Sequence, residues 1–446
     1  MSKVPEGGSP PKPITVGLLG LGTVGSGTIE VLRRNASEIS RRAGRDIVIT
    51  VASARDLKKE RAVSLEGIEL VATAGQIVSR PDIDIVVELI GGDTAARELV
   101  LKAIDNGKHV VTANKALLAR HGTEIFARAH AKGVMVAFEA SVAGGIPIIK
   151  AIREGLSANR IEWIAGIING TCNYILSEMR DKGLPFSMVL AEAQRLGYAE
   201  ADPAFDVEGI DAAHKLTILA AIAFGIPMQF DRVYTEGITR LTAIDLKYAE
   251  GLGYRIKLLG ITRRTPKGIE LRVHPTLIPA RRLIANVEGV MNAVLVNGDA
   301  VGPTLYYGRG AGAEATASAV VADLVDVTRM ATSDPEHRVP HLAFQPDRLS
   351  SEPILPMEDV ETGCYLRLRA LDRPGVLADV TRICADLSIS IDAIFQKEAG
   401  EGEDQVDVVI LTHVTAERNV NAAIRRIEAL PTIPAPVVRI RLEELL

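Results

Sequence analysis

The chain has 446 residues, of which 47% are hydrophobic and 24% are charged, and its formal net charge is −5 at pH 7. This length is sufficient for two or three domains, each with its own core, and the composition is that of an ordinary soluble globular protein. The lack of a basic excess argues against a nucleic-acid-binding protein.

Cysteine content and apolar runs indicate a cytosolic protein. Cys172, Cys364 and Cys384 are too few and too scattered for a disulfide framework or a zinc cluster. Residues 1–13 are polar and rich in proline and glycine, which predicts a disordered tail and not a signal peptide. The longest uncharged apolar run, residues 216–230, is shorter than the ~20 residues of a membrane span.

Residues 14–140 alternate short apolar strands with helical segments. This pattern predicts an α/β dinucleotide-binding domain, a Rossmann-like doubly wound parallel sheet. We expect a returning helix over 311–331 to complete it. Residues 141–310 have longer helices with fewer strands, which predicts a second α/β domain.

The C-terminal part of the chain has a different pattern. Residues 332–362 carry five prolines and little periodicity, which is typical of a linker. Residues 363–443 follow the order βαββαβ, with a turn at 400–405, and this order predicts a ferredoxin-like domain.

A glycine motif lies between the first strand and the first helix. Its residues are Gly20, Leu21, Gly22, Thr23, Val24 and Gly25, a G-x-G-x-x-G pattern. Such glycines allow a tight turn and a close approach of the backbone to a pyrophosphate at the helix N-terminus. The motif alone is also compatible with a plain glycine-rich turn, but its strand-to-helix context favours a dinucleotide.

The end of the second strand bears on the choice of cofactor. An acidic residue normally binds the ribose hydroxyls at this point, but this chain has Ala54 and Arg55 there. An arginine can pair with a 2′-phosphate, so the sequence favours NADP over NAD. Asp56 keeps NAD open, and a plain surface arginine is the alternative.

The segment GYAEADPAFDVEGIDAAHK, residues 197–215, carries five carboxylates just before an apolar run. We expect a buried helix from near Val207, with Glu208, Asp211 and Lys215 on one face. Buried charges are paired or functional because desolvation is costly. A structural Asp–Lys pair is one interpretation, and a pocket for a cationic ligand is the other, since one lysine cannot neutralise all these acids.

Two further segments follow predicted strands. Lys115 lies at the expected carboxyl edge of the parallel sheet, where doubly wound folds bind their ligands, although a surface lysine is equally compatible. The stretch GTCNY, residues 170–174, is predicted as a turn whose backbone N–H groups could bind a carboxylate. Cys172 within it is expected to be a buried packing residue.

These motifs together resemble one enzyme family. GLGTVGSG, TANKALLA, EASVAGGIPII, INGTCNYIL, the 197–215 segment and GAGAEATASAVVADL, in this order, are similar to homoserine dehydrogenase. LDRPGVLADV is similar to the start of an ACT domain. The resemblance implies interconversion of L-aspartate 4-semialdehyde and L-homoserine with NAD(P)H in threonine, methionine and isoleucine biosynthesis, by a homodimer or homotetramer.

The resemblance also implies roles for individual residues. Lys215 and Lys115 would be catalytic, and Lys115 would lie near the nicotinamide. A monovalent cation, usually sodium in the family, would bind at a loop after residue 138, and residues 141–310 would form the catalytic, substrate and dimerisation domain. The implied substrate residues are Glu200, Asp211, Asp206 and Thr171; the cofactor pocket adds Gly197 and Gly312; the cation site comprises Glu139, Val142, Gly144 and Ile146. Threonine is the implied effector, bound near residues 372–375, so inhibition would be lost from a chain ending near Ser350.

One residue differs from the family pattern, and two alternative hypotheses about function stay open. Ala315 stands where the family usually has proline, which bears on the rigidity of the glycine-rich loop before it. Aspartate-semialdehyde dehydrogenase shares a substrate but requires a cysteine nucleophile and a histidine base. A non-catalytic amino-acid sensor is the second rival, and the presence of both lysines and the acids argues against it.

Overall fold

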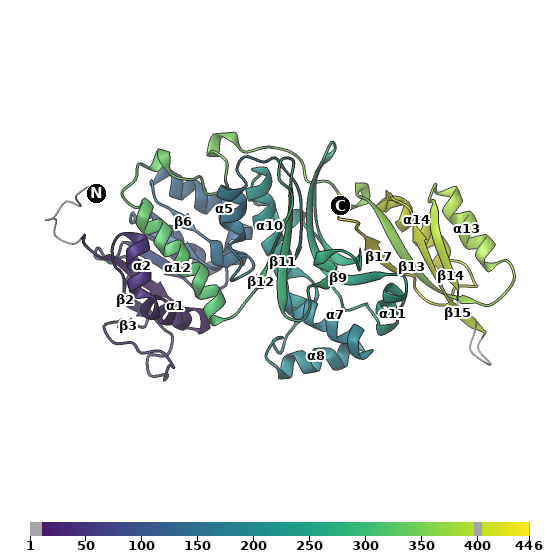
Figure 1. The fold of residues 1–446 in the computed structure, drawn as a ribbon, viewed down its shortest axis with the longest axis horizontal. Helices are drawn as coiled ribbons and strands as arrows, with labels where there is room; N and C mark the ends of the chain where they lie inside the picture. The colour runs from purple at the N-terminus through teal and green to yellow at the C-terminus, as the bar shows by residue number, and fades with distance from the viewer. Residues whose placement is uncertain (1–10, 397–403, 446) are drawn as a thin grey trace, which may run out of the picture. The chain divides into compact units, whose positions relative to one another are not determined.

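The computed structural model describes residues 11–396 and 404–445 (Figure 1). The expected N-terminal tail therefore lies mostly outside the described residues, as does most of the expected turn at 400–405. The chain divides into two compact units, and each is built from three segments. Unit 1 comprises residues 1–164, 214–231 and 292–351, and unit 2 comprises residues 165–213, 232–291 and 352–446.

Unit 1 is built around a six-stranded parallel sheet with the strand order β3-β2-β1-β4-β5-β6. The strands are β1 (Ile14–Leu19), β2 (Ile47–Ser53), β3 (Glu69–Val71), β4 (Ile85–Glu88), β5 (His109–Thr112) and β6 (Val136–Ala137). This is the order of a dinucleotide-binding Rossmann fold. This strand order confirms the predicted fold class. The strands carry apolar residues on both faces, so helices must cover both faces of the sheet.

Helices cover this sheet. They are α1 (Thr23–Arg34), α2 (Ala36–Ala43), α3 (Ala74–Val78), α4 (Thr94–Asp105), α5 (Lys115–Ala131) and α12 (Ala313–Met330). Figure 1 shows α12 beside α1 and α2, although it is far from them in the chain. The contact is close because Gly27 of α1 lies against the backbone of Ala313, where a Cβ would come within 2.7 Å of the carbonyl oxygen.

Other elements of unit 1 follow the parallel sheet. A short turn of helix, η1 (Glu139–Ser141), leads to α6 (Ile148–Lys150) and the π-helical turn η2 (Ala151–Gly155). Strands β11 (Met291–Gly298) and β12 (Gly302–Arg309) are neighbours, and β11 is next to β7 (Ile161–Ile167). Helix α10 (Ile210–Phe224) gives its first residues to unit 2 and the others to unit 1. No helix in the described part of the chain is both long and apolar enough to cross a membrane.

Unit 2 combines a helical layer with antiparallel strands. Its first helices are α7 (Gly170–Lys182), α8 (Phe186–Arg195) and α9 (Ala204–Val207), followed by the short strand β8 (Tyr234–Thr235), α11 (Ala243–Gly251), β9 (Tyr254–Thr265) and β10 (Gly268–Pro279). Strands β9 and β10 form a long hairpin, in which Thr265 pairs with Gly268 and Tyr254 with Pro279.

The C-terminal part of unit 2 has the predicted βαββαβ order. Its elements are β13 (Glu361–Leu371), α13 (Val376–Asp386), β14 (Ile391–Gln396), β15 (Gln405–Thr412), α14 (Glu417–Glu428) and β17 (Val438–Leu442), with a two-residue strand β16 (Thr415–Ala416) that the sequence does not predict. The strand order β17-β13-β15-β14 is that of a ferredoxin-like sheet (Figure 1). Buried residues of α13 and α14 form one hydrophobic core with the strands.

The C-terminal sheet continues into the β9–β10 hairpin. Strand β17 pairs in parallel with β10, and Leu277 lies opposite Leu442 in this ladder. Arg272 of β10 is fully buried at this junction, and its guanidinium donates to Glu443 at 2.5 Å and to Glu270 at 2.8 Å. Burial opposes the ionisation of Glu443, but Arg272 and Arg263 together hold its pKa below the usual value. The chain after residue 352 is therefore part of the same compact unit as the β9–β10 hairpin.

The junction predicts a pH-dependent stability. His274 of β10 is fully buried, and burial together with the charges of Arg441 and Arg272 holds its pKa well below 6.5. The folded protein keeps this ring neutral, with Nε2 placed 2.7 Å from Arg272 Nη1 as an acceptor. The unfolded chain takes up a proton below pH 6.5, so the free energy of unfolding should fall there by up to about 1.4 kcal/mol per pH unit.

The matched variant is His274→Gln, which keeps an acceptor but does not titrate. Its melting temperature should lie below that of the parent chain at pH 8, and the difference should narrow as the pH falls from 6.5 to 4.5. A difference that stays constant over this range would show that His274 does not contribute the acid sensitivity.

Candidate active site

The glycine turn lies at the carboxyl end of β1, in unit 1. Gly20 has φ +97° and its Cβ would come within 2.8 Å of the carbonyl oxygen of Leu89, while a Cβ on Gly25 would come within 2.3 Å of the carbonyl oxygen of Gly20. At Gly22 a Cβ would meet nothing within 4 Å. Gly22 is also the N-cap of α1, and no side chain caps this helix. The turn thus leaves backbone N–H groups and space for a phosphate, and the residues fit a dinucleotide.

A buried carboxylate forms hydrogen bonds at the same edge of the sheet, and the sequence analysis did not predict it. Glu88 ends β4 and is completely buried, and burial raises its pKa. Its oxygens accept hydrogen bonds from the Thr112 hydroxyl at 2.7 Å and from the backbone N–H of Ile90 at 2.9 Å. The only sequence signal is an acid inside an apolar strand followed by two glycines.

Lys115 is the first residue of α5, directly after β5. The preceding residue, Asn114, caps the helix by accepting from Leu117 N at 3.1 Å. Its amide nitrogen donates to the carbonyl of Gly92 at 2.6 Å, which ties the loop after β4 to the start of α5. Because β4 and β5 are adjacent parallel strands, this arrangement brings Lys115 to the edge of the sheet that also carries the glycine turn.

The loop after β2 carries the residues considered for cofactor choice. Arg55 and Asp56 are both exposed, just beyond the strand end at Ser53. The Asp56 carboxylate accepts from the backbone N–H of Lys58 at 2.9 Å, so it is used in a local turn. Gly20 N donates to the Ser53 hydroxyl at 3.2 Å, which connects this strand end to the glycine turn.

The candidate cation loop follows η1. The Glu139 carboxylate accepts from the backbone N–H groups of Ile149 and Lys150, and burial together with the nearby Asp323 raises its pKa to about 7. Ala143 and Gly144 both have positive φ, +54° and +49°. Among the described residues, no group of three or more His, Cys, Asp and Glu side chains could hold a metal ion. A cation here would be held by backbone carbonyl oxygens, the ligand type that hard cations take.

The long helix in the acidic segment begins later in the chain than the sequence predicts. Helix α10 begins at Ile210 and not near Val207, because Gly209 adopts φ +82° and separates it from α9. Glu208 is therefore not on the same helical face as Asp211, and the prediction that it is was wrong. Its carboxylate instead accepts from the Thr239 hydroxyl at 3.1 Å.

The predicted burial of α10 is confirmed. Its residues are mostly buried, including Asp211, which is 5% exposed, and Lys215 lies one helical turn later and is half-buried. The acids form a gradient of exposure, since Glu200 is exposed and Asp206 is half-buried. Asp206 and Asp211 converge on one side chain, Asn169, whose amide nitrogen donates to them at 2.7 and 2.8 Å.

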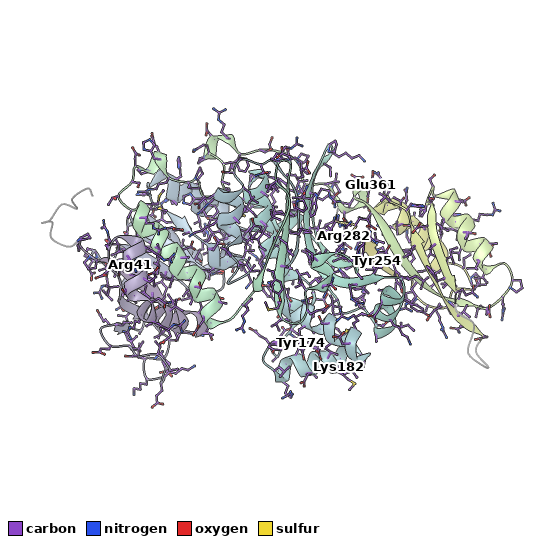
Figure 2. The ribbon with its side chains drawn as sticks, viewed as in Figure 1. Arg41, Tyr174, Lys182, Tyr254, Arg282 and Glu361 are labelled. Atoms are coloured by element: carbon purple, nitrogen blue, oxygen red, sulfur yellow. The ribbon has the colours of Figure 1, made fainter. Side chains whose placement is uncertain are left out.

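The stretch 170–174 is the first turn of α7 and not a free turn, so that prediction was wrong. Asn169 caps this helix by accepting from Cys172 N at 2.8 Å, which occupies one of the N–H groups that was expected to bind a carboxylate. The Thr171 hydroxyl donates to the carbonyl of Tyr198 at 2.7 Å. Tyr174, labelled on α7 in Figure 2, packs edge-on against Tyr198 with ring centroids 5.0 Å apart.

Two glycines and one alanine complete the positions named from sequence. Gly197 follows α8 with φ +75°, and Gly312 is the N-cap of α12 with φ +123°. Ala315 lies in the first turn of α12, before the bond from Thr316 N to the carbonyl of Gly312. A proline is tolerated in a first turn because its missing N–H would have no helical partner there, so the helix accommodates either residue.

Comparisons with known proteins agree with this geometry. Residues 20–139 match the family model of the homoserine dehydrogenase NAD-binding domain, residues 147–325 match homoserine dehydrogenase, and residues 365–432 match the ACT domain. The chain is 65% identical to a homoserine dehydrogenase of Pseudomonas aeruginosa over 97% of its own length and all of the relative's. The chain belongs to the homoserine dehydrogenase family.

Other members of the homoserine dehydrogenase family also match over nearly the whole chain. The crystal structure of a homoserine dehydrogenase from Thiobacillus denitrificans superposes with a TM-score of 0.94 at 72% identity, covering 98% of this chain and 99% of that one. A homoserine dehydrogenase of Bacillus subtilis is 38% identical over 95% of this chain and 96% of the relative. The resemblance to this family, with its NAD-binding and ACT domains, is confirmed, and the chain is an oxidoreductase of this kind.

Family membership also bears on the rival enzyme. Aspartate-semialdehyde dehydrogenase would need a reactive cysteine, but Cys172 is fully buried. Its Sγ lies 3.2 Å from the carbonyl oxygen of Asp206, to which it donates. A buried thiol of this kind has a packing role, as the sequence predicts.

Proposed function

We propose that the chain interconverts L-homoserine and L-aspartate 4-semialdehyde with a nicotinamide cofactor, and that Lys215 moves the proton. The observation that carries this proposal is the convergence of Asp206 and Asp211 on Asn169. Asp211 lies one turn of α10 before Lys215. Two carboxylates held together suit the ammonium group of an amino acid. A lysine one turn further along suits the hydroxyl that loses or gains a proton at the reacting carbon.

The roles of the other residues follow from their positions. Glu200, which is exposed, is proposed to bind substrate together with Asp206, Asp211 and Thr171, which lies at the start of α7 two residues after Asn169. The cofactor accepts or supplies the hydride when bound. In unit 1, the glycine turn would hold the pyrophosphate and Lys115 would lie toward the nicotinamide. Gly312 of unit 1 and Gly197 of unit 2 are also proposed to contact the cofactor.

We propose NADP as the preferred cofactor because Arg55 and two lysines follow β2 and the acid beside Arg55 is engaged. Arg55, Lys58 and Lys59 are exposed there, while Asp56 accepts from the backbone of its own turn. A 2′-phosphate would meet positive charge, whereas ribose hydroxyls would lack a ready carboxylate acceptor. NAD remains the alternative cofactor.

Further proposals concern the cation, the assembly and the setting of the reaction. A monovalent cation, sodium in the first instance, would bind the carbonyls of Glu139, Val142, Gly144 and Ile146, where consecutive positive-φ residues turn the backbone. We propose a homodimer or homotetramer in the cytoplasm, acting in threonine, methionine and isoleucine biosynthesis. Three buried thiols suit a reducing compartment.

We propose domain limits of 14–140 with 311–331, 141–310 and 363–443, and threonine as the effector of the last domain. A pocket of about 180 Å³ lies at the turn between β13 and α13 and is lined by residues including Asp372, Pro374, Gly375 and Gln396. Gly375 has φ +93° and begins α13 without a side-chain cap, so this turn offers backbone donors to a small amino acid.

The proposed catalytic role predicts a separation of chemistry from binding. Lys215→Ala should lower kcat by ~10²–10⁴, the usual share of one general acid or base, while the Kd for NADPH stays near normal. Glu200→Gln should act largely on the KM for homoserine. The measurements are steady-state homoserine oxidation, cofactor titration and the melting temperature of each variant.

The control for this experiment is Lys182→Ala, which removes an exposed lysine at the end of α7 (Figure 2) and should leave kcat unchanged. If Lys215 serves only a structural ion pair, its loss would cost roughly 3–5 kcal/mol of stability by leaving a buried charge uncompensated. A destabilised Lys215→Ala protein with near-normal turnover when folded would contradict the catalytic role.

The cofactor proposal predicts a selective effect of Arg55→Ala. Loss of one charge-assisted contact costs roughly 1.5–3 kcal/mol, so the KM for NADP should rise by about 10- to 150-fold while that for NAD changes little. The matched control is Arg41→Ala, which removes the same charge from an exposed position on α2 (Figure 2). Equal effects of Arg55→Ala on the two cofactors would refute the assignment.

The regulatory proposal predicts that threonine inhibits the full chain and that Asp372→Ala weakens inhibition without lowering uninhibited activity. A chain ending near Ser350 is a poor test, because it would remove Glu443 from the fully buried Arg272 and β17 from β10. The measurement is the threonine concentration that halves homoserine oxidation. Unchanged inhibition in Asp372→Ala, and also in Gly375→Val, would place the effector elsewhere.

A further inference from the structure

Asn169 is the residue on which two acids of the segment, Asp206 and Asp211, converge. It lies between β7 and α7 and is 4% exposed. All of its side-chain hydrogen-bonding capacity but one lone pair is engaged: Nδ2 donates to Asp206 Oδ1 at 2.7 Å and to Asp211 Oδ2 at 2.8 Å, and Oδ1 accepts from Cys172 N at 2.8 Å.

The chemistry of these contacts explains why an amide stands here. Two carboxylates that both lie within hydrogen-bond distance of one nitrogen repel each other, and only a group with two N–H donors and no negative charge can bridge them. A carboxylate at position 169 would add a third negative charge, and a hydroxyl would supply one donor only. The amide is therefore suited to hold Asp206 and Asp211 close together.

The orientation of the amide is fixed from the other side. Because Oδ1 caps α7, a flip of the amide would turn its oxygen toward two carboxylates and its NH₂ group toward a backbone donor. Two further bonds hold the same segment against α7, from the Cys172 thiol to the carbonyl of Asp206 and from the Thr171 hydroxyl to the carbonyl of Tyr198. The start of α7 thus sets the position of the acids.

We infer that Asn169 is a positioning residue for the substrate ammonium group, acting by holding Asp206 and Asp211 together as a single paired acceptor. This inference rests on the proposed function, since it assumes that these acids bind an amino-acid ammonium. Asn169 itself acts through the acids, with its two N–H groups directed at them, and α10 then carries the chain from Asp211 to Lys215.

The decisive variant is Asn169→Asp in the full chain, because aspartate also caps helices well and so preserves the bond to Cys172 N. It removes both donors and adds a carboxyl group between the acids. The KM for homoserine should rise at least about tenfold, as expected for loss of hydrogen bonds to charged groups, while the Kd for NADPH stays unchanged. Asn169→Ser, which also caps but offers one donor, should have a smaller effect in the same direction.

The pH profile separates positioning from a purely structural role. The two neighbouring carboxylates raise the pKa of the introduced carboxyl group above its usual value, and once protonated it can donate one hydrogen bond. The kcat/KM of Asn169→Asp relative to the parent chain should therefore recover as the pH is lowered. A KM that stays at the parent value, or a defect that does not depend on pH and follows a loss of melting temperature, would overturn the inference.

A neighbouring asparagine on α7 serves as the matched control. Asn173 is also buried, but its amide nitrogen donates to the backbone carbonyls of Val287, Gly289 and Met291 and not to the acids. Asn173→Asp should lower the melting temperature without the pH-dependent rise in KM. If the parent chain does not oxidise homoserine, or Lys215→Ala keeps full turnover, the proposed function fails; if both behave as expected and Asn169→Asp keeps the parent KM, only this inference fails.

Discussion

The parallel pairing of β10 with β17, together with the ion pair between the buried Arg272 and Glu443, is the constraint on which the organisation of unit 2 depends. Arg272 is surrounded by protein, and its charge is compensated by Glu443 from the last residues of the chain and by Glu270 from its own strand. A buried guanidinium without such partners is strongly unfavourable. The β9–β10 hairpin therefore requires the C-terminal segment in place, and an ACT domain that could have been a separate appendage is part of the same compact body.

A second set of contacts connects this junction to the acid segment. Glu236, just after β8, accepts from Arg441 of β17 at 2.8 Å, and two residues later Ile238 N donates to the carbonyl of Val207 at 2.8 Å. Gly237 between them is so close to Val207 that a Cβ would come within 2.3 Å of its carbonyl oxygen. A displacement of β17 would therefore break these bonds or move the segment beside Asp206.

The same local device occurs once in each unit. Asn114 in unit 1 and Asn169 in unit 2 each stand between a strand and a helix, and each caps the helix through its side-chain oxygen. Each then uses its amide nitrogen for the site, Asn114 to hold the loop at Gly92 and Asn169 to hold two carboxylates. A helix start is a rigid point of the fold, so a side chain anchored there positions its partners well.

Local sequence was enough to predict the strand and helix alternation of residues 14–140, the glycine turn and the βαββαβ order at the C-terminus, because periodicity and turn residues act over short distances. Short sequence motifs spread along the chain also indicated the homoserine dehydrogenase family. The tertiary structure decided the start of α10, where Gly209 interrupts the helix, and it made residues 170–174 a capped helical turn. It alone brought Asn169 to acids far along the chain and β17 to β10, since such pairings depend on which surfaces meet in the folded chain and no local pattern encodes them.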